Sequence, residues 1–299
     1  MDIDIVKHIR QIFFKDCALI DSTRFCARRN QRMNNDLLLE AVLASGVVLP
    51  APGPGFLRLQ AAAADDDAGP KELAHAVSQD PAITGALLRV ANSPVFRPRS
   101  APRSALEAIS MLGRTRTLAT AASVALRNQG DGKNAAALEV VWAACASAAD
   151  HSYRAARATR FKSLADTAYL AALMQDAGIA VVLRRAPEHA GVLRISGTAI
   201  EVGARALDAL TGTDHAAAGY LVARNWKLPL EVCEAIRAHH DPRLASRLGD
   251  DSRRISLLLA AGRRLRDGAS PDWTDWEEQV EAELGFSAED LDQLAAAPD

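Results

Sequence analysis

Several features that define other classes of protein are scarce in this sequence. Aromatic residues make up 5% of its 299 residues, and its few cysteines show neither a Cys-x-x-Cys spacing nor a secretory framework. The four cysteines are Cys17, Cys26, Cys145 and Cys233. Without a disulfide or zinc-finger pattern, we expect reduced thiols and a cytoplasmic location.

Long uninterrupted apolar runs are also missing. The longest, residues 168–183, is broken by Gln175 and Asp176, too early to span a bilayer. The first residues lack the basic segment of a secretory signal. We therefore expect no membrane anchor.

Strand-like alternation is absent, and apolar residues recur at helical spacing along nearly the whole chain. This pattern predicts an all-α protein with an amphipathic helix near the N-terminus. It also predicts buried side chains at Ile83, Leu87, Leu88, Ile109, Leu112, Leu170, Leu173, Val181, Val182, Leu221 and Ile236, with Trp142 and Trp226 mostly enclosed.

Glycine and proline divide the chain into four predicted parts. Residues 1–36 form an N-terminal helical segment, 37–130 a first lobe, 131–268 a second lobe and 269–299 an acidic C-terminal segment. The boundary between the lobes is placed at Gly130-Asp131-Gly132. Within the first lobe, Asp80 and Ser104 are predicted to cap helices, and Gly113 to interrupt one.

Positive charge is lacking at the C-terminal end. The last thirty residues hold ten carboxylates and no Lys or Arg, which leaves a net charge near +8 on the rest. Trp273, Trp276, Val280 and Leu284 fall along one side of a helix in this segment. We expect this helix to dock on the basic body, with a partner-binding helix as the alternative.

A turn at Gly113 between residues 105–112 and 115–126 resembles a helix-turn-helix. The second helix offers few polar side chains that could reach bases, namely Arg116, Thr117, Thr120, Ser123 and Arg127, and the rest of it is apolar. Because a reading helix needs a whole polar face, nucleic-acid binding is only an alternative here.

The segments "VSQDPAITGALLRVANSPVF", "SALEAISMLGRTRTL", "LAALMQDAG", "TDHAAAGYLVARNWKLP" and "AIRAHHDP" follow one another in order. Together they resemble the HDOD domain, a bacterial signalling module related to the HD metal-dependent phosphohydrolases. The resemblance covers roughly residues 37–264. It implies an all-helical HD-like bundle with an N-terminal helical lobe.

The resemblance also implies that the metal site of the catalytic relatives is degenerate in this chain. Their early histidine corresponds to Ala144, and the histidine of their His-Asp pair corresponds to Gln175. These two losses are expected to abolish tight metal binding and catalysis, so that neither a catalytic residue nor a cofactor is assigned.

Four further positions of that site keep donor side chains: Asp176, His215, His239 and His240. They could still gather one ion, which leaves a residual metal-dependent phosphohydrolase or cyclic-dinucleotide phosphodiesterase as an alternative. Local explanations are available for all four. Asp176 could form a polar pair with Gln175, His215 lies in the first turn after the cap Asp214, and histidine cations would suit the end of a helix.

The preferred interpretation is a non-catalytic signalling or scaffold protein that acts through protein–protein contacts. Its partners would be signalling proteins of unknown identity, and the resemblance places such proteins near cyclic-dinucleotide pathways. A cyclic dinucleotide is therefore a second candidate ligand, with Arg97, Arg99 and Arg103 as phosphate contacts.

Overall fold

The computed structural model describes residue 40 and residues 42–96, 101–128, 132, 134–194, 200–268 and 271–296. The chain separates into two units, residues 1–40 and 41–299, and the description below concerns the second. The predicted N-terminal helix, Cys17, Cys26, Arg97 and Arg99 lie outside the described residues. The lobe boundary near residue 130 stays a prediction.

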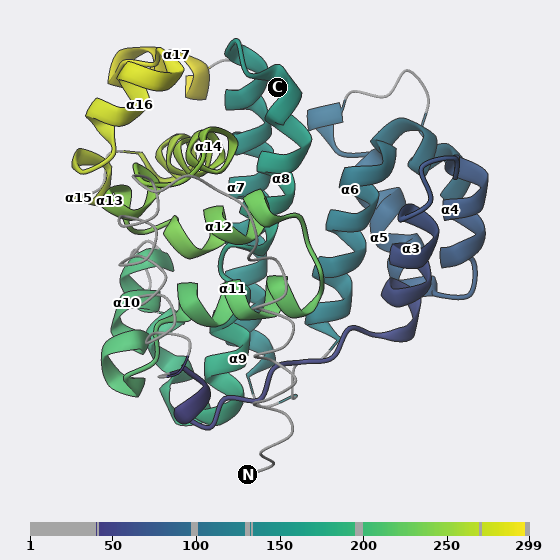
Figure 1. Ribbon diagram of the computed structural model, residues 1–299, viewed down its shortest axis with the longest axis horizontal. Coiled ribbons are helices and arrows are strands. Elements are labelled where there is room, and N and C mark those ends of the chain that lie inside the picture. Colours follow the sequence, from purple (N-terminus) through teal and green to yellow (C-terminus); the bar gives the residue numbers. More distant parts are fainter. Residues whose placement is uncertain are drawn as a thin grey trace, which may run out of the picture. The chain divides into compact units, whose positions relative to one another are not determined.

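The described residues form helices joined by turns and loops and contain no strand, so the all-α prediction is confirmed (Figure 1). The first helices are α3 (Pro54–Ala63), α4 (Pro70–Val77), α5 (Pro81–Ala91), η1 (Pro94–Phe96) and α6 (Ala105–Arg127). Then follow α7 (Ala135–Ala158), η2 (Lys162–Leu164), α8 (Ala165–Met174), α9 (Ala177–Arg185), η3 (Pro187–Arg194), α10 (Ile200–Thr211), α11 (His215–Asn225) and α12 (Leu230–Ala238). The last are α13 (Pro242–Ala245), α14 (Asp250–Asp267), α15 (Pro271–Thr274), α16 (Glu277–Leu284) and α17 (Ala288–Ala296).

Helices α3 to α6 pack on one another, and their ends follow the capping chemistry of the sequence. The carboxylate of Asp80 accepts a hydrogen bond from the Ile83 amide at 3.1 Å, which satisfies a free donor in the first turn of α5. The Ser104 hydroxyl accepts one from the Glu107 amide in the same way. In a capping box the Glu107 carboxylate would accept from the Ser104 amide, but here it accepts from the amide of Arg103 at 2.8 Å.

Helix α6 is kinked at Gly113, whose φ of 74° only glycine adopts readily. Beyond the kink, Thr117 and Thr120 are buried and donate their hydroxyls to backbone carbonyls one turn earlier. Arg116 is paired with Asp166 at 2.9 Å. Three of the five polar side chains that could reach bases, those of Arg116, Thr117 and Thr120, are therefore engaged within the protein, which argues against the use of this helix in reading bases.

The helices from α7 to α14 form a second set, which follows α3 to α6 in the chain. Helix α7 packs against both α8 and α14, while α11 packs against α9 and α12 (Figure 1). Helices α9 and α11 approach very closely, because a Cβ at Gly178 would lie 1.9 Å from the carbonyl oxygen of His215 and 2.5 Å from the amide nitrogen of Gly219. Glycine at 178 thus permits the crossing that brings Asp176 near His215.

Residues 162–185 are long and apolar enough to cross a membrane, but 89% of their most apolar stretch is buried inside the protein. These residues therefore form part of the protein core.

The predicted buried side chains are confirmed at Ile83, Leu87, Ile109, Leu112, Leu170, Leu173, Val181, Val182, Leu221, Ile236, Trp142 and Trp226. Leu88 is only partly buried, because the buried stripe of α5 passes through Ala86 and Leu87. The Trp226 indole donates to the Pro50 carbonyl at 2.8 Å.

The acidic C-terminal segment docks on the body of the same chain, as predicted. The side chains of its stripe are buried in a cluster with residues of α14: Trp273, Trp276, Val280, Leu284, Leu257, Leu258 and Ala261. At the edge of this contact Arg254 pairs with Glu283 at 2.9 Å and Arg264 with Asp292 at 2.6 Å. Both apolar contacts and ion pairs therefore hold the C-terminal segment on α14.

Candidate metal centre

Four side chains of the second set of helices converge at the ends of three helices. Asp176 lies in the turn between α8 and α9, His215 is the first residue of α11, and His239 and His240 directly follow α12. Each offers one donor atom, and these four atoms all lie within 4.8 Å of one another. The structure thus gathers the four positions that the sequence could only name one by one.

The carboxylate of Asp176 forms the centre of this cluster. Its Oδ1 lies 3.6 Å from Nε2 of His215 and 3.5 Å from Nε2 of His239. Its Oδ2 receives the Sγ–H of Cys145 at 3.5 Å. Burial alone would raise the pKa of Asp176, but the neighbouring His239 and His215 lower it well below its usual range. Asp176 is therefore an anion.

Hydrogen bonds on the far side of two imidazoles fix which nitrogen faces Asp176. Nδ1 of His215 lies 2.7 Å from Oδ2 of Asp208, and Nδ1 of His239 lies 2.6 Å from the carbonyl oxygen of Ile236. A carbonyl oxygen and a carboxylate both accept, so each Nδ1 carries the proton. In each neutral ring this leaves a lone pair on the Nε2 that faces Asp176.

His240 completes the cluster, and burial and neighbouring positive charges shape its chemistry. Its ring centroid lies 4.0 Å from that of His239 and 5.1 Å from that of His215. Burial lowers the pKa of His239 and lowers that of His240 well below the ordinary value. Both directions favour the neutral ring and argue against the interpretation of these two residues as cations at a helix end. Burial also opposes the charged form of His215, but Asp208 outweighs it and raises the pKa.

The residues present fit one divalent transition-metal ion. Nε2 of His215, Nε2 of His239 and both ring nitrogens of His240 are buried without a hydrogen-bond partner among the described residues. Buried polar atoms rarely stay unpaired, and here the lone pairs face a carboxylate, which also only accepts. Three imidazole nitrogens and one carboxylate oxygen are ligands that suit zinc, manganese or iron.

The local explanation of Asp176 is also wrong. Its carboxylate does not cap α9, and the Gln175 side chain contacts Arg263 instead. Arg263 donates to Oε1 of Gln175 at 3.4 Å and to the carbonyl oxygen of His239 at 2.6 Å, and it pairs with Glu201 at 3.0 Å. A guanidinium thus lies beside Gln175, the first position where the resemblance implies a lost ligand.

A second guanidinium lies beside Ala144, the other position where the resemblance implies a lost ligand. Arg266 donates to the Ala144 carbonyl at 3.0 Å and also contacts Glu201 and Asp267. Burial raises the pKa of Glu201, and the nearby Arg263 and Arg266 oppose that rise. Arg263 and Arg266 therefore place positive charge beside Gln175 and Ala144.

Sequence reasoning missed the supporting residues Cys145, Glu201, Asp208, Arg263 and Arg266 as parts of this site. None lies in a motif with a recognisable spacing, and only the tertiary fold brings them to the cluster. Of the three arginines expected to contact phosphate, Arg103 is exposed on the described surface. The other two lie outside the described residues.

Comparison with known proteins agrees with the fold. The HDOD domain model matches residues 49–242, about two thirds of the sequence. The chain therefore belongs to the HDOD domain family. No curated protein sequence matches it.

Several solved structures share the fold. An HDOD domain protein of unknown function from Geobacter sulfurreducens is 22% identical with a TM-score of 0.62, and the match covers 87% of this chain and 93% of that one. A protein provisionally named a metal-dependent phosphohydrolase, from Shewanella amazonensis SB2B, is 23% identical with a TM-score of 0.60, covering 88% and 94%. A protein provisionally named a signal transduction protein, from Marinobacter aquaeolei VT8, is 20% identical with a TM-score of 0.59, covering 97% and 62%.

Proposed function

We propose that this protein is a non-catalytic signal-transduction protein of the HDOD family, whose second set of helices is built around one closed metal site. The observation that carries the metal site is the pair of unpaired Nε2 atoms, of His215 and His239, that face Oδ1 of Asp176 at 3.6 and 3.5 Å. This proposal replaces the expectation of a metal-free centre and keeps the expectation that the protein is not an enzyme.

The number and burial of the ligands support a non-catalytic role. Structural sites commonly use four protein ligands, whereas catalytic sites use three and keep a position open for water or substrate. Asp176, His215 and His239 are all at least 95% buried. An ion at this place would supply the positive charge that the four donors lack and would tie the ends of α8, α11 and α12 together.

The arginines beside Gln175 and Ala144 support the same conclusion. A hydrolytic two-metal centre clamps the attacking and the leaving oxygen between its ions. Here Arg263 and Arg266 are already engaged with protein carbonyls and with Glu201, so this half of the site is filled. Signalling through contacts with other proteins is therefore the role that we assign, in line with the name of the Marinobacter protein.

Elemental analysis of the purified full chain, prepared without chelators, tests the metal site. We expect about one Mn, Fe or Zn per chain and its loss in His239→Ala. His189→Ala is the matched control, since His189 lies in η3 outside the cluster. Metal-free protein after growth with all three metals would contradict the metal site.

Activity assays on the metal-loaded protein test the absence of catalysis. We expect no hydrolysis of nucleoside phosphates or cyclic dinucleotides. Turnover that disappears in Asp176→Ala would instead show a phosphohydrolase, whatever the metal content.

A further inference from the structure

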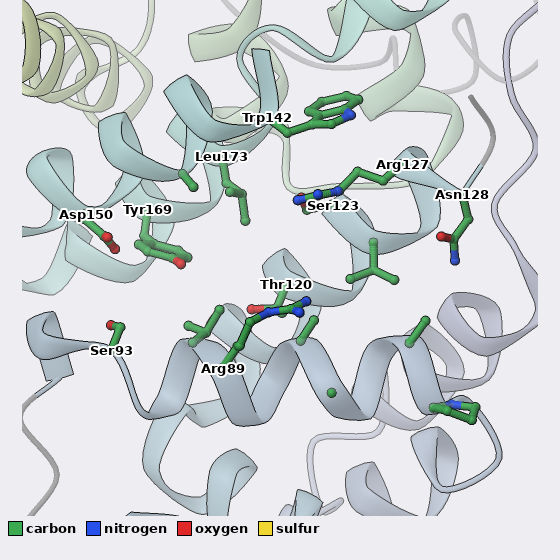
Figure 2. Close-up of a pocket in the computed structure, with 17 residues that line it drawn as sticks. Arg89, Ser93, Thr120, Ser123, Arg127, Asn128, Trp142, Asp150, Tyr169 and Leu173 are labelled. Carbon is green, nitrogen blue, oxygen red and sulfur yellow. The ribbon is translucent and has the colours of Figure 1, made fainter. Parts of the chain in front are cut away.

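A cleft that is separate from the metal centre lies between α5, the second half of α6, α7 and α8 (Figure 2). Its volume of about 480 Å³ is typical of sites for small molecules. None of the four candidate metal ligands lines it. The cleft is bounded by helices of both sets, so a ligand here would contact α5 and α6 on one side and α7 and α8 on the other.

Two arginines give the cleft its charge. Figure 2 shows the guanidinium groups of Arg89, from α5, and Arg127, from α6, in the middle of the cleft. Arg89 is exposed, and within the described part of the chain it forms neither a hydrogen bond nor an ion pair. Arg127 pairs with Glu139 at 2.5 Å, but both side chains are exposed, and such surface pairs hold weakly.

Among the described residues that line the cleft, Asp150 alone carries a carboxylate against these two cations. In Figure 2 it lies beside Tyr169 at one end, away from Arg127. The middle of the cleft is therefore positive. Guanidinium groups bind phosphate oxygens through paired hydrogen bonds, so two of them facing one space suit a phosphate group.

The remaining lining suits a flat organic group with polar substituents. Trp142 and Tyr169 line the cleft with the small part of their rings that is left exposed, 4% and 3% of each residue, and Leu173 lies between them on the same wall (Figure 2). The hydroxyl oxygen of Ser93 is buried without a hydrogen-bond partner among the described residues, although it lines the cleft. A ligand hydroxyl or amino group would satisfy it, and Asp150 would accept from a second donor.

We propose that this cleft binds a ring-bearing organic phosphate of mononucleotide size, with its phosphate between Arg89 and Arg127 and its ring against Trp142 and Leu173. This site differs from the loop of Arg97, Arg99 and Arg103 that the sequence suggested for a cyclic dinucleotide. It does not depend on the metal centre, because no residue is shared between the two sites.

Calorimetric titration of the full chain tests the proposal, with AMP and GMP as mononucleotides, inorganic phosphate, and cyclic di-GMP as separate probes. We expect a mononucleotide to bind and inorganic phosphate to bind at least about tenfold more weakly, because it lacks the ring. Arg89→Gln and Arg127→Gln should each weaken mononucleotide binding about tenfold or more. Arg184→Gln, which removes an exposed arginine of α9 outside the cleft, should change nothing.

Gly85→Leu separates loss of binding from loss of folding. Gly85 lines the cleft, and no atom lies within 4 Å of a Cβ placed on it, so a leucine there fills the cleft without a clash at its Cβ. Because glycine weakens a helix interior, the melting temperature should stay equal or rise while binding is lost.

Four results would overturn the proposal. They are no heat with any mononucleotide at millimolar concentration, binding that survives Gly85→Leu or both arginine substitutions, phosphate binding as tightly as a mononucleotide, and binding of cyclic di-GMP alone. Metal content is measured independently, so these results leave the metal centre untouched.

Discussion

Nε2 of His239 lies 3.5 Å from Oδ1 of Asp176 in the buried interior of the protein, and in the neutral ring this nitrogen carries a lone pair rather than a hydrogen. The Nδ1–H of His239 is already given to the Ile236 carbonyl, so its Nε2 can only accept. Two acceptors held face to face in a buried place repel each other unless a cation lies between them. In its neutral form His215 stands in the same relation to Asp176, at 3.6 Å, although Asp208 raises the pKa of this ring. This relation is the physical basis for the proposed metal ion.

Asp208→Asn should weaken metal binding without removing a ligand. The Asp208 carboxylate accepts a hydrogen bond from Nδ1 of His215. A carboxylate bonded in this way to a ligand histidine orients the ring and raises its basicity. We expect a loss of about 10–100-fold in affinity, measured by competition with a coloured chelator. Asp214→Asn is the matched control, since asparagine still caps α11 and Asp214 does not contact the His215 ring in this way. Equal affinities in both variants and the wild type would contradict this role of Asp208.

Gly178→Ala should disturb both stability and the metal centre. The added Cβ would lie 1.9 Å from the carbonyl oxygen of His215, so α9 and α11 must move apart. We expect unfolding to become easier by about 1–3 kcal/mol in urea titrations, together with weaker metal binding. Gly191→Ala has open space around its Cβ and should do neither. An unchanged unfolding midpoint in Gly178→Ala would show that the crossing is looser than the structure has it.

Removal of residues 270–299 should destabilise the protein strongly. The segment buries Trp273, Trp276, Val280 and Leu284 on α14, and losing this burial costs on the order of 5 kcal/mol or more. Trp276→Ala alone should cost about 3–5 kcal/mol, while Glu278→Ala on the exposed side of α16 should cost little. Thermal melting and denaturant unfolding measure these effects. A truncated protein that melts like the full chain, but loses a partner from cell extract, would contradict docking as the main role.

The ion pairs of Glu283 should make the docking of α16 depend on pH. Burial opposes the charged form of Glu283, but hydrogen bonds from Arg254 and Arg253 outweigh it, and its pKa is lowered. A lowered folded pKa gives stability that is present above the unfolded pKa, near 4.3, and is lost as the pH falls through the folded value. Glu283→Gln should therefore destabilise the protein by no more than about 1 kcal/mol at pH 7.

The difference in unfolding free energy between the wild type and Glu283→Gln should shrink toward zero in strong acid, because Glu283 of the wild type is then protonated and uncharged. Unfolding free energies of both proteins at a series of pH values check this, with Glu281→Gln, an exposed glutamate of the same helix, as the control. A difference that does not change with pH would show that Glu283 acts through packing rather than through charge.

The parts of the fold that the sequence predicts are those encoded within a few neighbouring residues. The cap at Asp80 and the kink at Gly113 follow from side-chain and backbone chemistry that acts over one helical turn. The ends of the helices in the C-terminal segment are also set by neighbouring residues. Gly285 ends α16 at a φ of 76°, and Ser287 and Asp290 exchange hydrogen bonds at the start of α17.

The metal centre was harder to predict because its parts depend on how helices cross. Asp176, His215 and the two histidines after α12 each have a plausible local role, and each was expected to fill it. The pairing of Asp208 with His215 requires the turn between α10 and α11, and the contact of Cys145 with Asp176 requires α7 to lie against α8. No spacing within the sequence contains that information.

The most direct measurement of the central claim is anomalous X-ray diffraction from crystals of the full chain prepared with Zn²⁺. Data are collected at X-ray energies just above and just below the zinc absorption edge. The account predicts one strong anomalous peak per chain, bounded by Asp176, His215, His239 and His240, that disappears below the edge and in crystals of His239→Ala. Crystals prepared in the same way that show no anomalous peak among these four residues would contradict it.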